Sequence, residues 1–309
     1  MHKCIIIGAG TAGLTAAIYL ARANTQPLVI TGLGTSTHLK ASMELDSFPG
    51  FPKGVKGPEL LDNMRKQAER FGAELRSGRV SKVDLSSRPY TVWLESGAAL
   101  QCETVIVSTG VSPNYLGIPG EKPFIGRGVY SCATCSGFFF EDKQLIVVGS
   151  GNAALEEAGY LSRFARQVTL VNPAAEFQAN PRLLERSRAN SKIRFELECT
   201  PVEVIGGDRG VAGLNVNRHG RPTPDTIPAD AIFAAVGVTP NTQFLEGQLP
   251  VDEAGYLLVG PGTTETSIPG VFACGDVQDP KYRQPVTAAG SGCMAALDCE
   301  RYLEGNGRA

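Results

Sequence analysis

The fold is decided by a run near the start of the chain, Cys4-Ile5-Ile6-Ile7-Gly8-Ala9-Gly10-Thr11-Ala12-Gly13. Its apolar half is typical of a parallel strand that is buried on both faces. The glycines predict a tight turn and the start of a helix, in the strand–turn–helix order of a dinucleotide-binding unit. In such a turn one glycine makes the bend, one lets the backbone approach a pyrophosphate, and one lets the helix pack on the strand. The pattern favours a nucleotide at this turn; the alternative is a glycine turn without a ligand.

The same pattern occurs again at Leu145-Ile146-Val147-Val148-Gly149-Ser150-Gly151-Asn152-Ala153-Ala154. The match continues downstream, where Tyr160-Leu161 corresponds to Tyr19-Leu20. Ala154 takes the place of the third glycine, which is a permitted variant. The repeat predicts a second nucleotide site at Gly149, Gly151, Asn152 and Ala153, with Asn172 at the end of the next strand. The alternative is a duplicated fold that no longer binds anything.

The order of the remaining apolar segments predicts how the two copies are joined. Strands are expected at 104–107 and 232–236, a returning strand at 270–276, and a final helix at 288–303. The predicted fold class is therefore α/β, with two Rossmann-like domains of three ββα layers, the second inserted into the first. We expect the first domain to span residues 1–115 and 247–309, and the inserted domain to span 116–246.

Composition excludes several classes of protein. The 309 residues carry a formal net charge of -2 and are 42% hydrophobic, as in a globular protein. No basic stripe indicates nucleic acid, no polybasic segment indicates an anionic membrane, and no apolar run is long enough to span a bilayer. The first apolar run is too short for a signal peptide and leads directly into glycines, so a cytoplasmic location is expected.

The sharpest chemical signal is a pair of cysteines, Cys132 and Cys135, in the run Cys132-Ala133-Thr134-Cys135. The chain has eight cysteines, and only these two have two-residue spacing. Two cysteines so spaced can close a small, easily reduced disulfide, and the spacing can lower a thiol pKa. The alternatives are packing cysteines or half of a zinc site. A structural zinc site needs four ligands, and the chain has three scattered histidines, so no metal is predicted.

Together the motifs resemble those of bacterial low-molecular-weight thioredoxin reductases, in order and over nearly the whole chain. The resemblance is carried by the two regions above and by Phe48-Pro49-Gly50-Phe51-Pro52, Ser108-Thr109-Gly110, Gly137-Phe138-Phe139, Gly275-Asp276, Tyr282-Arg283-Gln284 and Gly290-Ser291-Gly292-Cys293-Met294-Ala295-Ala296-Leu297.

The resemblance implies a homodimer with one FAD per chain. It places the FAD pyrophosphate at Gly8, Gly10, Thr11, Ala12 and Gly13, and the rest of the FAD near Val80, Thr109, Gly110, Gly275, Asp276, Arg283, Gln284 and Val286. Cys135 would be the flavin-proximal sulfur, and Cys132 would attack a thioredoxin-like protein. The inserted domain would rotate to bring the flavin first to its reductant and then to the dithiol.

The segment that binds the NADPH 2′-phosphate in this family departs from the pattern. Pro173, Ala174 and Gln178 stand where the family has arginines. A phosphate of nearly two charges needs cationic, preferably bidentate, partners, so NADPH is not the expected reductant. NADH is not strongly favoured either, because Asn172 occupies the position of the acid that would bind its ribose.

Two further departures concern proton transfer. Ser136 follows the dithiol where the family has an aspartate, and a hydroxyl is a poor general acid at neutral pH. Either another group moves the proton, or the rate and direction of exchange differ. His38 lies in a stretch that contacts the flavin in the family; it is either a proton carrier or an ordinary loop residue.

We therefore expect a disulfide oxidoreductase that passes electrons from FAD to Cys132 and Cys135 and then to thioredoxin or a similar protein. Its donor would be a protein such as ferredoxin. In a variant of this interpretation, the vacated second site still holds another nucleotide or even a second FAD. The alternatives are a flavin dithiol oxidase that uses O2 and a non-enzymatic flavin redox sensor.

Overall fold

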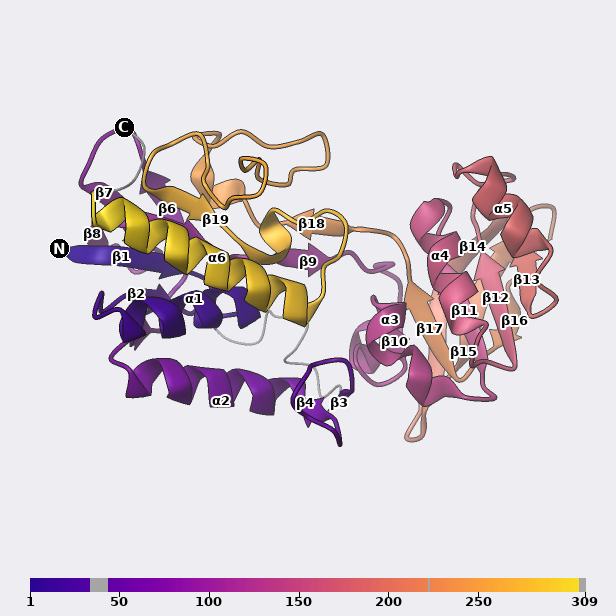
Figure 1. Cartoon of the computed structure of the whole chain (residues 1–309). Helices are drawn as coiled ribbons and strands as arrows, with labels where there is room; N and C mark the ends of the chain where they lie inside the picture. Colours follow the sequence, from indigo (N-terminus) through magenta and orange to yellow (C-terminus); the bar gives the residue numbers. More distant parts are fainter. Residues whose placement is uncertain (34–43, 222, 306–309) are drawn as a thin grey trace. The chain divides into compact units, whose positions relative to one another are not determined.

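The computed structural model describes residues 1–33, 44–221 and 223–305. They form two units, each with its own hydrophobic core (Figure 1). Unit 1 holds the described residues up to Ser112, apart from 44–47, and those from Thr239 onward. Unit 2 holds Pro113–Val238 together with residues 44–47. His38 lies outside the described residues.

Unit 1 is built on a mixed sheet whose parallel part has the order β5-β2-β1-β8-β19. β7 and then β6 continue from β8 in antiparallel fashion. The strands are β1 (His2–Ile7), β2 (Leu28–Ile30), β5 (Glu74–Arg76), β6 (Val80–Asp84), β7 (Tyr90–Leu94), β8 (Ala99–Val107) and β19 (Val271–Ala273). The return of β19 to β8 makes unit 1 discontinuous in sequence, as the motif order predicts.

The helices of unit 1 follow from local signals. They are α1 (Thr11–Arg22), α2 (Gly57–Arg70) and α6 (Pro285–Leu303), with the short turns η4 (Gln243–Leu245) and η5 (Gly275–Val277). α6 begins three residues before the predicted 288, because proline suits a first helical turn and the Gln284 N–H donates to Thr287 Oγ1 at 3.2 Å. Two short strands, β3 (Glu44–Leu45) and β4 (Val55–Lys56), precede α2.

Unit 2 repeats the layout of unit 1. Its five parallel strands have the order β13-β12-β11-β17-β10, beside an antiparallel β14-β15-β16 sheet. The strands are β10 (Val129–Tyr130), β11 (Gln144–Val148), β12 (Gln167–Val171), β13 (Ile193–Glu196), β14 (Cys199–Gly207), β15 (Gly210–Arg218), β16 (Asp225–Pro228) and β17 (Ala231–Ala234). The helices are α3 (Ala133–Ser136), α4 (Asn152–Leu161) and α5 (Pro181–Arg188), with η2 (Lys122–Phe124) and η3 (Gly137–Phe140). The predicted fold class is confirmed.

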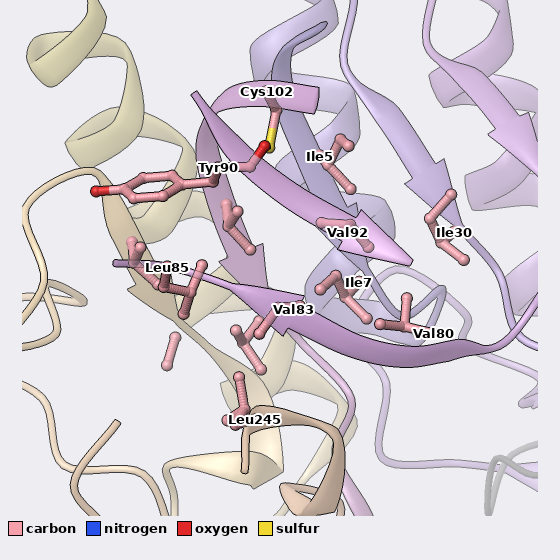
Figure 2. Packing of buried hydrophobic residues seen from close by; sticks show 14 of the residues in the cluster. Ile5, Ile7, Ile30, Val80, Val83, Leu85, Tyr90, Val92, Cys102 and Leu245 are labelled. Atoms are coloured by element: carbon pink, nitrogen blue, oxygen red, sulfur yellow. The ribbon is translucent and has the colours of Figure 1, made fainter. Parts of the chain in front are cut away.

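The core of unit 1 shows how the first strand specifies its place. Ile5 and Ile7 point into one cluster with Ile30, Val83 and Val92, and all five are buried (Figure 2). Full burial of one such side chain stabilises the fold by about 1.5–3 kcal/mol. Because the strand is buried on both faces, every residue from Cys4 to Ile7 is apolar, as the sequence pattern indicates.

Residues 239–246, which the sequence analysis places in the inserted domain, belong to unit 1. β9 (Val111–Pro113) and β18 (Val238–Pro240) form a two-stranded sheet at the ends of the inserted segment. Beyond it, Asn241 hydrogen-bonds to the segment after β8, and Leu245 is buried in the core of unit 1. These contacts place the boundary between Val238 and Thr239, before the predicted end of the inserted domain at residue 246.

Candidate functional site

Two glycines of the first fingerprint turn, Gly8 and Gly13, leave no room for a side chain. Gly8 has φ of +115°, and a Cβ there would lie 2.4 Å from the carbonyl oxygen of Ser108. A Cβ on Gly13 would lie 2.1 Å from the carbonyl oxygen of Gly8. The Ser108 hydroxyl donates to the carbonyl of Ile7 at 3.0 Å, which ties the turn to the end of β8. The bend of the turn at Gly8 and the close packing of α1 on the turn at Gly13 therefore both require residues without a side chain.

The N-terminus of α1 is open to a ligand. Gly10 is the N-cap of α1 and has no side chain that could cap the helix, and no heavy atom lies within 4 Å of where its Cβ would be. Helix N-termini with free N–H groups bind phosphate well. The turn from Gly8 to Gly13, including Thr11 and Ala12, thus has the shape that a pyrophosphate requires.

A second chain segment packs against the same turn. A Cβ on Gly275 would lie 2.8 Å from Ala12 Cβ, and a Cβ on Gly292 would lie 2.1 Å from the Ala12 carbonyl oxygen. The N–H of Gly275 donates to Ser291 Oγ at 2.9 Å. α1, η5 and α6 therefore meet around Ala12, and Asp276 follows directly.

Asp276 has a buried carboxylate oxygen, Oδ1, with no hydrogen-bond partner among the described residues. Burial, and secondarily the charge of Asp279, raise the pKa of Asp276 to about 6, and nearby Arg283 opposes the shift. A buried acceptor without a donor is costly, so this oxygen suits a ligand hydroxyl. The glycine turn and this acceptor together fit FAD. The turn suits the pyrophosphate of FAD, and the Asp276 oxygen suits a ribityl hydroxyl.

The loop before α6 is organised by Asp279. Its carboxylate accepts hydrogen bonds from the N–H groups of Lys281 at 2.9 Å, Tyr282 at 2.8 Å and Arg283 at 3.0 Å. Arg283 is held at φ of +49°. Gln284 then caps α6, and Val286 on its first turn is exposed. Three residues of the predicted FAD site, Arg283, Gln284 and Val286, therefore lie together on one short segment.

The other predicted FAD contacts have structural partners of their own. Thr109 Oγ1 donates to the carbonyl of Asn241 at 2.7 Å, so its hydroxyl is already engaged. Gly110 has φ of +65°. Val80, at the start of β6, is 8% exposed and lies in the core cluster, where Figure 2 shows it near Ile7.

Cys132 is disulfide-bonded, directly before α3. Its sulfur lies 3.5 Å from Thr134 Oγ1, and Ala133 anchors α3 in the core of unit 2. The side chains of Cys135 and Ser136 lie outside the described part of the chain. The disulfide at Cys132 makes this segment the redox-active candidate.

The remaining six cysteines are free: Cys4, Cys102, Cys199, Cys274, Cys293 and Cys299. Burial raises the pKa of Cys102 and of Cys274 to about 12, and it also raises the pKa of Cys199. Thiols react as thiolates, so these three are inert at neutral pH.

Unit 2 has a cleft of 560 Å3 at its own fingerprint turn. Gly149, Ser150 and Gly151 lie on one side, and Pro173 lies at the end of the neighbouring strand. The rest of the lining is Tyr115, Leu116, Ile118, Val148, Thr200, Pro201, Ala235 and Val236. None of the described residues that line the cleft is charged, so the cleft offers a pyrophosphate-type turn without a cation.

The polar side chains beside this turn are engaged internally. The buried Asn172 amide donates to the Glu176 carbonyl at 2.9 Å, and its Oδ1 accepts from the Ala174 N–H at 2.9 Å. Asn152 Oδ1 accepts from the N–H of Asn180 at 2.7 Å. Both asparagines predicted for a second nucleotide site therefore hold the loop 172–180 in place, and Ala153 is exposed on α4.

One wall of the cleft is held by a residue that the sequence analysis missed. The Glu121 carboxylate is 3% exposed and accepts from the N–H groups of Leu116 at 2.8 Å and Gly117 at 2.7 Å. Asp279, Ser108 and Gly292 were missed as well. Ser108 and Gly292 lie inside motifs already recognised, so their neighbours in sequence could have indicated them.

Among the described residues, no group of three or more His, Cys, Asp or Glu side chains could hold a metal ion. In the same part of the chain, no helix has the length and hydropathy needed to cross a membrane.

Comparison with known proteins places the chain among redox flavoenzymes. Residues 2–292 match the family described as pyridine nucleotide-disulphide oxidoreductase. The chain is 45% identical to the thioredoxin reductase of Mycolicibacterium smegmatis, over 98% of this chain and 97% of that protein. It is 44% identical to a Pseudomonas fluorescens protein named glucosaminate ammonia-lyase, over 98% of this chain and 96% of that protein. The solved thioredoxin reductase from Giardia duodenalis has a TM-score of 0.91 at 37% identity and covers 98% of each chain.

Proposed function

The chain belongs to the pyridine nucleotide-disulphide oxidoreductase family as a thioredoxin-reductase-like flavin disulfide oxidoreductase, and we propose that its electron donor is not NADPH. The observation that carries this proposal is the uncharged lining of the cleft in unit 2, with Pro173 at the strand end. A 2′-phosphate without a cationic partner would lose the charge-assisted bonds that normally hold it.

We take FAD to be the cofactor of unit 1, held at Gly8–Gly13 and at Asp276. When bound there, FAD supplies two-electron chemistry between a donor and a disulfide. The protein's own part is to hold the pyrophosphate at the N-terminus of α1, to offer the buried Asp276 oxygen as an acceptor, and to keep Arg283 and Gln284 on an ordered loop.

We pair Cys132 with Cys135 as the redox disulfide. Two electrons and two protons convert it to two thiols. The Cys132 thiolate then attacks a disulfide of thioredoxin or a similar protein, and Cys135 displaces the reduced partner from the mixed disulfide. The partner leaves with two thiols, and the Cys132–Cys135 bond is restored. In the family, the aspartate that follows the dithiol supplies a proton during this exchange. Ser136 stands at that position, and because a serine hydroxyl does not ionise readily, the proton comes from another group or from solvent.

Ferredoxin is the proposed donor, because a small protein donor needs no nucleotide clamp. The intact turn at Gly149 and Gly151 supports a second proposal, that the cleft still holds a nucleotide without a 2′-phosphate, or a second FAD. Six free cysteines among the described residues suit a reducing compartment such as the cytoplasm.

A homodimer is supported by apolar side chains on the surface of unit 1. Met294 and Leu297 on α6 are 42% and 38% exposed, and Tyr19 on neighbouring α1 is 38% exposed. In Figure 1 the two helices run side by side. Sedimentation of the holoprotein and of Leu297→Glu tests this pairing: the variant should sediment as a monomer, and a monomeric wild type would contradict it.

The donor is tested by anaerobic bleaching of the bound flavin. Reduced ferredoxin, freed of excess reductant, should bleach the flavin and support reduction of thioredoxin, whereas NADPH should act at least about tenfold more slowly. The matched control is Ala174→Arg combined with Gln178→Arg, which restores cations beside the cleft and should recover NADPH reduction. Fast bleaching of the wild type by NADPH would refute the proposal.

A second assay in air separates the other functions. Sustained oxidation of small dithiols with release of peroxide, and without reduction of thioredoxin, would indicate a dithiol oxidase, and no turnover with any donor would indicate a redox sensor. We do not propose ammonia-lyase activity from the relative named glucosaminate ammonia-lyase. Elimination of ammonia does not require a redox disulfide, whereas Cys132 is disulfide-bonded. Extracting the cofactor and counting flavins per chain tests whether the second site is occupied.

A further inference from the structure

Electrons have to pass between the FAD-binding residues of unit 1 and Cys132 in unit 2, so the ends of the inserted segment govern how the dithiol is presented. We propose that Asn241 is a positioning residue that ties together the two stretches of unit 1 from which this segment leaves and to which it returns. The proposal rests on the proposed function only in requiring that flavin and dithiol exchange electrons.

The side chain of Asn241 connects the two ends of the segment. Its Nδ2 donates to the carbonyl of Thr109 at 3.0 Å, and its Oδ1 accepts from Ser112 Oγ at 2.8 Å. Thr109 and Ser112 lead into the inserted segment, and Asn241 lies just after the chain leaves it. A single carboxamide therefore holds the outgoing and the returning chain together.

The backbone of Asn241 adds two more bonds. Its N–H donates to the Gly110 carbonyl at 3.0 Å, and its carbonyl accepts from Thr109 Oγ1 at 2.7 Å. Gly110 has φ of +65°, a conformation that favours glycine, so the carbonyl that accepts this bond belongs to a turn that other residues would strain. Because Thr109 and Gly110 are also predicted FAD contacts, the same bonds tie the connection to the flavin-binding region.

Only a carboxamide of this length fits both partners at once. Aspartate would keep the acceptor for Ser112 but lose the donor to Thr109, and alanine would lose both. Asn241 is partly buried, so the partners left behind would not be fully compensated by water. Movement at both ends of the segment should then increase, and the dithiol should spend less time in the arrangement that exchanges electrons.

The test uses the FAD-bound protein under anaerobic conditions and two routes to a bleached flavin. Dithiothreitol reduces the flavin through Cys132, whereas photoreduction acts on the flavin directly. Asn241→Ala should slow the dithiothreitol route by about tenfold and leave photoreduction unchanged, because small positional errors are costly for a transfer step. Hydrogen exchange at residues 109–113 and 239–241 should become faster.

Ser112→Ala, which removes one of the two side-chain bonds, is the matched control and should have an intermediate effect. An unchanged or faster dithiothreitol route in Asn241→Ala would overturn the proposal. So would equal slowing of both routes, since Asn241 would then act through flavin binding. If dithiothreitol failed to bleach even the wild type, the proposed function itself would fail.

Discussion

Replacing Asp276 with Asn should stabilise the FAD-free protein at neutral pH and weaken its hold on FAD. Asp276 has one buried oxygen without a donor among the described residues, and burial raises its pKa from the ordinary value of 3.8 to about 6. A raised carboxyl pKa means that the folded state prefers the protonated form. Its contribution to stability is therefore present at low pH and is lost as the pH rises through 6.

The size of the effect follows from these two values. A group that titrates at about 6 in the folded chain and 3.8 in the unfolded chain favours folding by about 1.4 kcal/mol more at pH 5 than at pH 8. Asparagine cannot titrate. The free energy of unfolding of Asp276→Asn minus that of the wild type should therefore be about 1.4 kcal/mol larger at pH 8 than at pH 5.

Urea unfolding of the two FAD-free proteins at both pH values measures this difference, and release of FAD followed by flavin fluorescence measures the hold on the cofactor. A neutral acceptor makes a hydrogen bond about half as strong as a carboxylate, so Asp276→Asn should bind FAD about tenfold more weakly, and Asp276→Ala more weakly still. A stability difference that does not change with pH would refute the burial argument. Unchanged FAD affinity in both variants would refute the assignment of Oδ1 to a cofactor hydroxyl.

Three further predictions follow from close contacts. Gly13→Ala should purify without FAD, since its Cβ would lie 2.1 Å from a carbonyl oxygen of the turn; a normal flavin content would contradict this. Glu121→Ala should lower the free energy of unfolding by about 1–3 kcal/mol, because the partly buried N–H groups of Leu116 and Gly117 lose their acceptor, and a loss under about 0.5 kcal/mol in urea would count against it. Cys132→Ser should keep one FAD per chain but lose thioredoxin reduction, and retained turnover would show that another thiol does the work.

Much of the fold could be predicted because its signals are local. The apolar runs of β1 and β11 end at glycines whose spacing permits little else, and the run at 270–276 indicated the return of β19 to β8. The boundary at 238/239 could not be predicted, because it depends on the bonds of Asn241 to a segment more than a hundred residues earlier.

The candidate site likewise contains some residues that the sequence could reveal and others that it could not. Gly8, Gly13 and Gly275 were recognisable because each needs to lack a side chain. Asp279 was not, since an aspartate before a proline has the look of an ordinary loop residue. Its carboxylate matters only because the loop turns three N–H groups toward it, and no spacing rule predicts that turn.

The discontinuity of unit 1 has a consequence for biosynthesis. β19 pairs with β8 at the centre of the sheet of unit 1, and α6 packs on α1. However, β19 and α6 are synthesised only after the whole of Pro113–Val238. At about 5–20 residues per second, the chain emerging between Val238 and the end of α6 takes roughly 3–13 s. During this time the inserted unit can fold on its own. One edge of β8 still lacks its partner β19, and the apolar face of α1 still lacks α6. The nascent protein should therefore need chaperone protection chiefly for its N-terminal third.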